Sequence, residues 1–142
     1  MQHLAAFFLG CLLTLSTASF AESRFNNTLG DLEGNPSKLV FLIIENDKYI
    51  VSDIRSNRFV ELRRSAKERL IDTAEAEQVV VIATNQRYTA YSARVQAWVD
   101  IRTQAGERLQ SIRADDFAVL ITTNKRYLSF NGANGVWNSR AR

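Results

Sequence analysis

Cysteine and histidine are almost absent from this chain of 142 residues. The one cysteine, Cys11, and the one histidine, His3, both lie within Met1–Ala21. Without that segment, no residue remains to form a disulfide, a thiolate nucleophile, an imidazole base or a Cys/His zinc site. A domain without these residues has to be held together by its core alone.

Glycine and proline are also scarce, with six and one residues respectively, so the chain has no collagen-like or linker-like segment. Hydrophobic residues make up 46% of the sequence and charged residues 23%, which is ordinary for one globular domain. The formal net charge of +3 suits contact with anionic surfaces or glycans without requiring it.

Residues 1–21 contain no Lys, Arg, Asp or Glu. Their apolar run, Leu4–Leu15, is short for a membrane span, and the small-residue site Ser19-Phe20-Ala21 follows it. This pattern predicts a secretory signal peptide cleaved after Ala21 or Ala18, and hence a periplasmic or secreted protein. Two alternatives are an uncleaved anchor and lipid attachment at Cys11, because Leu9-Gly10-Cys11 resembles the end of a bacterial lipobox.

A pattern of apolar run, polar corner and aromatic-rich run occurs three times in the chain. The corners are 39 residues apart, and they are Asn46–Tyr49, Asn85–Tyr88 and Asn124–Tyr127. Other equivalent positions match as well, including Ile43, Ile82 and Ile121. We expect the corner asparagines to adopt the left-handed conformation that tight turns require.

The middle copy predicts four short strands, at Val79–Thr84, Tyr88–Ser92, Trp98–Thr103 and Leu109–Ala114. The segment Ser65–Ala76 has the composition of a helix. Its counterpart Gln104–Asp115 contains Gly106 and has the pattern of a turn and a strand. The strand is therefore the favoured prediction for both segments.

Four strands per copy predict an all-β fold of three four-stranded antiparallel repeats, arranged as propeller-like blades. The apolar first strands, such as Val79–Thr84, fit positions that are covered on both faces by neighbouring blades. A β-trefoil is the alternative. The predicted organisation is a signal peptide at 1–21, an arm at 22–38 and a three-repeat β domain at 39–142. The arm has a short strand around Leu29–Leu32 and could complete the last repeat.

The string VVVIATNQRYTAYSARVQAWVDI resembles blade repeats of uncharacterised bacterial β-propeller-type proteins. It shares their apolar strand, their Asn/Asp-x-Arg corner, a strand ending in Ser and a following aromatic residue. It is more broadly similar to quinoprotein-like blades, although Arg94-Val95-Gln96 replaces their Thr-Gly corner. The resemblance implies a blade fold and no catalytic residues. Gln96-Ala97-Trp98 also matches the QxW element of ricin-type trefoil lectins, but Asn57-Arg58-Phe59 and Gly135-Val136-Trp137 depart from it.

Two sets of equivalent residues are candidates for ligand binding. The aromatic set could form stacking platforms, although such residues more often pack between repeats; it consists of Phe59, Trp98 and Trp137. The basic set could ring one face and attract an anionic ligand, or could simply be solvated turn residues; it consists of Lys48, Arg87 and Arg126.

Two charged segments are further candidates for function. Asp115 and Asp116, with Glu75 and Glu77 in the preceding copy, could bind calcium or act in acid–base chemistry. An acidic turn is favoured, because no loop with alternating oxygen ligands surrounds them. Arg55–Arg69 is rich in basic residues, and with an export signal it favours a glycan or an anionic envelope surface over nucleic acid.

These observations predict an exported, non-enzymatic binding or assembly module that takes a glycan or an envelope partner. We expect no cofactor, no metal, no nucleic acid and no integral membrane span in the mature chain. A homodimer would complete six blades, because end blades leave apolar strands uncovered. The alternative function is a carboxylate-based hydrolase of the cell envelope, using residues such as Asp115 and Asp116.

Overall fold

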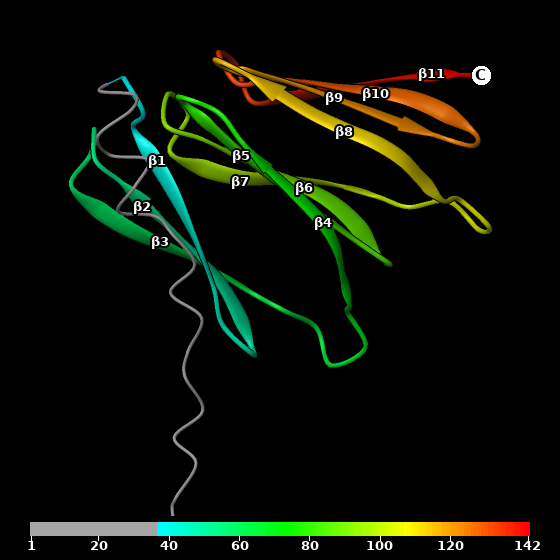
Figure 1. Ribbon diagram of the computed structural model, residues 1–142, viewed down its shortest axis with the longest axis horizontal. Coiled ribbons are helices and arrows are strands. Elements are labelled where there is room, and N and C mark those ends of the chain that lie inside the picture. The colour runs from blue at the N-terminus through cyan, green and yellow to red at the C-terminus, as the bar shows by residue number, and fades with distance from the viewer. Residues whose placement is uncertain (1–36) are drawn as a thin grey trace, which may run out of the picture.

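The computed structural model describes residues 37–142. The predicted signal peptide, the lipobox at Cys11 and the strand around Leu29–Leu32 lie outside the described residues. Within residues 37–142 the chain forms eleven strands in three antiparallel sheets (Figure 1). This part of the chain contains no helix of the length and apolarity needed to cross a membrane.

Each sheet is a meander whose neighbouring strands follow one another in the sequence. The N-terminal sheet consists of β1 (Val40–Ile44), β2 (Lys48–Asp53) and β3 (Arg58–Arg63). The middle sheet consists of β4 (Leu70–Glu75), β5 (Val79–Thr84), β6 (Arg87–Ser92) and β7 (Ala97–Arg102). The C-terminal sheet consists of β8 (Leu109–Asp115), β9 (Ala118–Thr123), β10 (Arg126–Asn131) and β11 (Val136–Ala141).

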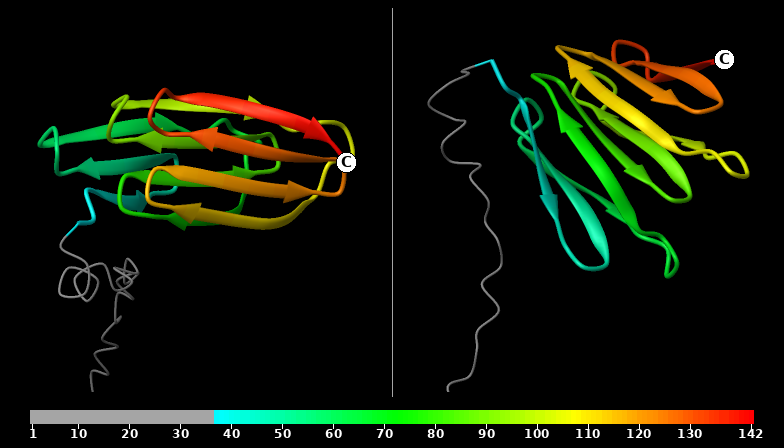
Figure 2. Two further views of the ribbon diagram at one scale, coloured as in Figure 1. Left: turned by 90° about the horizontal axis from the view of Figure 1, so that it is seen from above. Right: turned by 45° about the vertical axis from the view of Figure 1, so that its right-hand side comes forward.

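The three sheets stack face to face as blades, as two further views show (Figure 2). The prediction of an all-β, three-repeat blade fold is confirmed. The β-trefoil alternative is wrong, because the strands form three separate sheets that stack on one another. The segment Ser65–Ala76 contains the strand β4, so the strand prediction is confirmed over the helix.

The sheets begin one strand earlier than the sequence repeat suggested. The predicted fourth strand of each copy pairs with the first strand of the next copy, as β4 does with β5 and β8 with β9. Short turns join these partners, whereas the longer segments 64–69 and 103–108 cross between sheets. The C-terminal sheet therefore has four strands of its own and does not need the arm to complete it. Among the described residues, the N-terminal sheet is the one with three strands.

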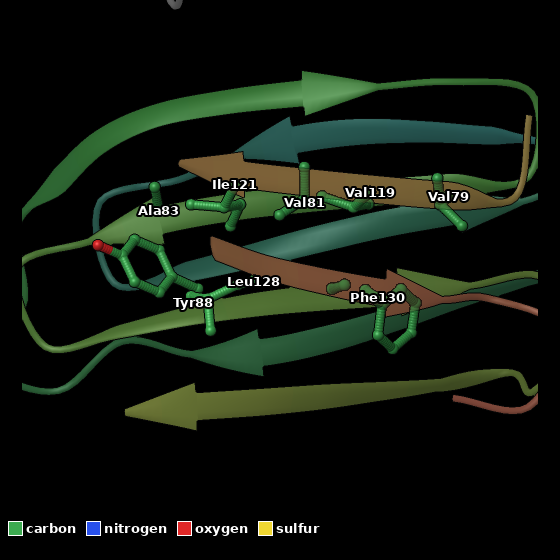
Figure 3. Packing of buried hydrophobic residues seen from close by; sticks show 9 residues of the cluster. Val79, Val81, Ala83, Tyr88, Val119, Ile121, Leu128 and Phe130 are labelled. Carbon is green, nitrogen blue, oxygen red and sulfur yellow. The ribbon is translucent and has the colours of Figure 1, made fainter. Parts of the chain in front are cut away.

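Two apolar layers hold the stack together. One joins the N-terminal and middle sheets and consists of Val40, Leu42, Tyr49, Val51, Val80, Ile82, Tyr91 and Ala93. The other joins the middle and C-terminal sheets (Figure 3) and consists of Val79, Val81, Ala83, Tyr88, Ala90, Val119, Ile121, Leu128 and Phe130. Alternate side chains of a strand point to opposite faces, so β5 contributes to both layers. Its continuous apolar sequence follows from that double burial.

The corner asparagines do not adopt the left-handed conformation that was expected. Positive φ angles occur instead in the turns at the other end of the sheets, at Asn57 (53°), Gln96 (59°), Asp116 (43°) and Gly135 (70°), and at Gly106 (69°) within the segment 103–108. Asn85 stabilises its corner through its side chain. Its Oδ1 accepts a hydrogen bond from the Arg69 amide at 2.6 Å, and its Nδ2 donates to the Lys67 carbonyl at 3.2 Å. Asn124 makes the equivalent bonds.

Candidate functional site

An ion pair between a half-buried arginine and a buried carboxylate connects the N-terminal and middle sheets. Arg87, the first residue of β6, donates from Nε to Glu68 Oε1 at 3.0 Å and from Nη2 to Glu68 Oε2 at 3.1 Å. Its Nη2 also donates to the carbonyl of Arg63, the last residue of β3, at 3.0 Å. The Glu68 side chain is only 1% exposed and accepts a further bond from the Ser65 amide at 3.0 Å. One guanidinium therefore links two sheets and the segment between them.

The next junction repeats this arrangement 39 residues later. Arg126 donates from Nε to Glu107 Oε1 at 2.8 Å, and from Nη2 to the Arg102 carbonyl at 2.7 Å. The third residue of the predicted basic set, Lys48, differs. It pairs with Glu61 at 2.9 Å and Glu45 at 3.6 Å within the N-terminal part of the chain. Ligand binding by this basic set stays a prediction, and two of its three members are engaged in junctions between sheets.

Both junction carboxylates remain ionised at neutral pH. Burial acts to raise the pKa of Glu68, but hydrogen bonds from Arg87 and the Ser65 amide outweigh it, so the pKa lies below its ordinary value. The pKa of Glu107 is lowered for the same reasons, with Arg126, Gln104 and Thr123 as donors. The charge of each carboxylate is thus matched by a partner inside the fold.

The strand ends that carry these pairs form a basic end of the molecule, made of residues 45–48, 63–69, 85–87, 102–108, 124–126 and 142. Its acidic residues are few: Glu45, Asp47, Glu68 and Glu107. Its basic residues are Lys48, Arg63, Arg64, Lys67, Arg69, Arg87, Arg102, Arg108, Lys125, Arg126 and Arg142. Acidic residues instead predominate at the opposite end: Asp53, Glu75, Glu77, Asp115 and Asp116, against Lys38, Arg55, Arg58 and Arg94.

Several cations of the basic end are exposed and lack a carboxylate partner. Within residues 37–142 no acidic side chain forms an ion pair with Arg63, Lys67, Arg69, Arg102, Arg108, Lys125 or Arg142. Such uncompensated charge raises the local concentration of anions. The carboxylates that could have neutralised it, Glu68 and Glu107, are already paired.

An open pocket of about 740 Å³ lies at this end, between the N-terminal and middle sheets. Its charged lining has more guanidinium groups than carboxylates: Arg63, Arg64, Arg87 and Arg102 against Glu68 and Asp100. Its neutral lining supplies hydroxyl and amide groups: Ser65, Asn85, Gln86 and Thr103. This lining can bind an anion by charge and by directed N–H donors.

Arg64 is held firmly within this pocket. It donates to the Asn46 carbonyl at 3.0 Å and to the Glu68 carbonyl at 3.2 Å, and its guanidinium carbon lies 5.3 Å from the Tyr49 ring centroid. Arg63 and Arg102 instead have exposed side chains. Arg64 and Arg87 therefore build the pocket wall, while Arg63 and Arg102 are free to meet a ligand.

The predicted aromatic set lies at equivalent positions of successive sheets. Trp98 Nε1 donates to the Val60 carbonyl at 3.3 Å, and Trp137 Nε1 donates to the Val99 carbonyl at 3.0 Å. Each tryptophan thus bonds to the preceding sheet and leaves its ring half-buried. The Phe59 side chain has no N–H group to donate, and the residue is 69% exposed. A stacking role for these rings stays a prediction.

The acidic candidates lie at the end opposite the pocket. Asp116 Oδ1 accepts a hydrogen bond from Gln78 Nε2 at 2.8 Å, across the junction of two sheets. Glu75 pairs with Lys38 at 3.3 Å and accepts from the Leu42 amide at 3.2 Å. In the described part of the chain, no group of three or more acidic, histidine or cysteine side chains could hold a metal ion. These contacts are structural, and the hydrolase alternative stays untested.

Arg102 was missed as a candidate in the sequence, and Arg63 and Arg64 were considered only as members of a basic run. The signal that could have found Arg63 and Arg102 is their 39-residue separation, which places a cation at the end of the equivalent strands β3 and β7. Their convergence with Arg87 was hidden, because it depends on the stacking of two sheets.

Fold and site together define a stack of β blades with one basic end. No family model matches the chain. No curated protein matches it either. One similar solved structure is a chain from a complex of S. cerevisiae Dbp5 with Nup159, Gle1, IP6 and ADP, with 10% identity and a TM-score of 0.43. Another is the N-terminal domain of Nup159, with 16% identity and a TM-score of 0.38.

These alignments cover 75% and 71% of this chain, but only 31% and 29% of the two neighbours. The chain therefore spans less than a third of the length of either structure.

Proposed function

We propose that this chain is an exported, non-enzymatic binding module of the bacterial blade-repeat type, and that its basic pocket takes an anionic glycan of the cell envelope. The observation that carries the proposal is the convergence of four arginines, among them the exposed Arg63 and Arg102, on a pocket whose carboxylate Glu68 is already paired. Guanidinium groups bind carboxylate and sulfate-like anions through paired N–H donors.

The lining favours a glycan over a nucleic acid. Proteins that bind single strands combine a basic groove with aromatic rings on which bases stack. Among residues 37–142 the pocket lining includes no aromatic residue, and it supplies hydroxyl and amide groups such as those of Thr103, Asn85 and Gln86. These groups match the hydroxyls of a sugar chain, while the arginines match its acidic groups.

Binding of the full chain to immobilised polygalacturonate and heparin tests the proposal, with neutral dextran as the comparison ligand. We expect salt-sensitive binding to the anionic glycans only. The double variant Arg63→Ala/Arg102→Ala should lower affinity at least tenfold. The matched control Arg55→Ala/Arg94→Ala removes the same charge at the opposite end of the molecule and should have little effect. Equal losses in both variants, or equal binding of dextran, would overturn the proposal.

The export part of the proposal rests on the leader at residues 1–21 and has its own test. Intact-mass measurement of protein exported from a bacterial host should show a chain beginning at Glu22 or Ser19. A chain beginning at a diacylated Cys11 would establish a lipoprotein in its place.

A dimer that completes six blades is a separate proposal. It is supported by apolar side chains exposed on the outer face of the C-terminal sheet, Leu120 and Tyr127 among them. The same face also carries Arg113 and Arg140, so we expect such a dimer to weaken in high salt. Light scattering over a range of protein and salt concentrations tests this; a monomer under all conditions would refute the dimer.

A further inference from the structure

We infer that the outer face of the C-terminal sheet takes the outer face of the N-terminal sheet of a second copy of this chain, with Phe59 of one copy packed into a hollow of the other. This inference rests on the dimer proposed above, and it adds which two faces meet and which side chains carry the contact. The two faces are the opposite ends of the stack (Figure 2).

At both junctions within the chain, an aromatic side chain of one sheet bonds to the backbone of the sheet before it. Trp98 Nε1 donates to the Val60 carbonyl, and Trp137 Nε1 donates to the Val99 carbonyl. A shift of 39 residues leads from Val60 to Val99 and then to Asn138 on β11. Among residues 37–142, the C-terminal sheet therefore carries the receiving position with no following sheet to fill it.

The receiving position of the C-terminal sheet is hollowed. Asn138 and its cross-strand partner Ser129 are both exposed. Together with Leu120 they line two open hollows of about 530 and 160 Å³, which share these three residues. The equivalent pair of the middle sheet, Ala90 and Val99, is covered by the C-terminal sheet. An aromatic side chain seated in such a hollow is a common anchor of protein interfaces.

The N-terminal sheet carries the aromatic side chain that fits. Phe59 is equivalent to Trp98 and Trp137, and it is 69% exposed, with no sheet of residues 37–142 over it. Val60 and Leu62 of the same strand pack against the middle sheet, so Phe59 points to the opposite, outer face. One end of the stack thus presents the ring, and the other end presents the hollow that receives it.

The charges beside the ring and the hollow are complementary. Glu61 follows Phe59 on the outer face of β3, and both residues are exposed. Arg140 follows Asn138 on the outer face of β11, and both are exposed as well. These strands occupy equivalent places in their sheets, so the repeat sets Glu61 opposite Arg140 when the ring lies in the hollow. Such a pair favours this contact over a wrong alignment.

Two copies of this contact close a dimer. If the C-terminal sheet of the first chain covers the N-terminal sheet of the second, a twofold axis gives the reverse contact as well. Both ends of both stacks are then covered, and two three-blade chains form six blades. The contact also covers exposed apolar side chains of both faces, namely Phe59, Leu120 and Tyr127.

Charge reversal tests which faces meet. The single variants Glu61→Arg and Arg140→Glu each set like charges against one another at both contacts, so we expect either variant to raise the dissociation constant of the dimer at least tenfold. An equimolar mixture of the two variants should restore the dimer, because each contact of the mixed pair then joins a cation to a carboxylate. Analytical ultracentrifugation of the full chain measures the two variants, their mixture and the wild type.

The matched controls Arg69→Glu and Asp72→Arg reverse charges of exposed residues in the middle sheet, just before and within β4. They should dimerise like the wild type, both alone and mixed. A second variant, Phe59→Ala, does not depend on charge, and it should also raise the dissociation constant at least tenfold because it removes the ring from the hollow.

The outcomes separate this inference from the dimer itself. A dimer that Glu61→Arg and Arg140→Glu both leave intact would overturn the inference and leave a dimer through other faces. Weakening by Arg140→Glu alone, without rescue in the mixture, would assign the contact to two C-terminal sheets. A wild-type monomer under all conditions would overturn both the dimer and the inference. If Phe59→Ala then lowered the unfolding free energy of that monomer, residues before Ser37 would be the occupant of this face.

Discussion

The middle and C-terminal sheets carry the same repeat but differ in what covers them. In the middle sheet every residue of β5 is buried, and so is every residue of β6 after Arg87. In the C-terminal sheet buried and exposed residues alternate along β9 and β10. The strands are equivalent in sequence position, so the difference arises from the number of neighbouring sheets rather than from the strands.

The outer face of the C-terminal sheet has more polar residues than the equivalent face of the middle sheet, as suits a surface exposed to water. Ala74, Val99 and Ile101 pack against the core on the covered face of the middle sheet. Their equivalents 39 residues later are Arg113, Asn138 and Arg140, all exposed. Terminal units of stacked repeats commonly have such a polar outer face, because no further unit covers them. The polar side chains of this face thus suit contact with water, whereas Leu120 and Tyr127 are the exposed apolar side chains on which the proposed dimer would pack.

The largest expected effect on stability comes from introducing a charged residue at equivalent positions of the middle and C-terminal sheets. Val81 is fully buried, whereas its equivalent Leu120 is 46% exposed. Val81→Asp should lower the free energy of unfolding by about 4 kcal/mol or more, because it buries an unpaired carboxylate. Leu120→Asp should cost less than about 1 kcal/mol. Urea unfolding measures both, and similar losses would mean that the outer face is covered in solution.

A second comparison concerns the cations at the start of β10 and β2. Arg126 pairs with a carboxylate whose side chain is fully buried, whereas the partner of Lys48 is half exposed. Arg126→Ala should cost about 3 kcal/mol, because it leaves Glu107 charged and buried. Lys48→Ala should cost much less, because its ion pairs are exposed to solvent and water screens them. Thermal and urea unfolding test this ranking, which equal costs would refute.

A third comparison concerns one polar contact that differs between the junctions. Tyr91 Oη donates to Asp53 Oδ2 at 2.6 Å at the first junction, whereas Phe130 and Ser92 occupy these positions at the second. Tyr91→Phe should cost about 2 kcal/mol, because the buried carboxylate loses a donor. Adding Asp53→Ser should recover part of that cost, since it recreates the pair found at the second junction. A double-mutant cycle with no coupling would show the contact to be unimportant.

The smallest expected effect is the response to acid. The folded-state pKa of Glu107 is lowered, so its ion pair contributes stability above the ordinary value of 4.5 and loses it as the pH falls through the folded value. Glu107→Gln should therefore flatten the fall in unfolding free energy below about pH 4.5. Urea unfolding from pH 6 to pH 3 measures the slope. An unchanged slope would assign the acid response to other carboxylates.

Local pattern was sufficient to predict the strands of this fold. Apolar β-branched runs such as Val79–Thr84 form strands because their side chains favour an extended backbone, and this preference is visible in the local sequence. The 39-residue repeat then predicted that three units share one structure. It did not show that β4 pairs with β5, because the sequence of a strand does not determine whether it joins the preceding sheet or the following one. The prediction of left-handed backbone at the corner asparagines was wrong, because Asn85 stabilises its corner through side-chain hydrogen bonds.

The candidate site was only partly predictable. Arg87 and Arg126 were chosen for their repeated position, but their carboxylate partners Glu68 and Glu107 lie 19 residues earlier in the chain, on segments that cross between sheets. Arg102 carried no distinguishing signal within its own strand. The pocket exists because two sheets stack, and a sequence pattern holds no direct record of that contact.

The sequence by itself determined the all-β content, the threefold repeat and the residue types at each corner, because these depend on backbone preferences and on a periodicity visible within one copy. The tertiary structure decided which strands share a sheet, which face of each sheet is covered and which arginines meet at the basic end. Those properties depend on distances between residues in different copies, and only the packing of the sheets against one another sets such distances.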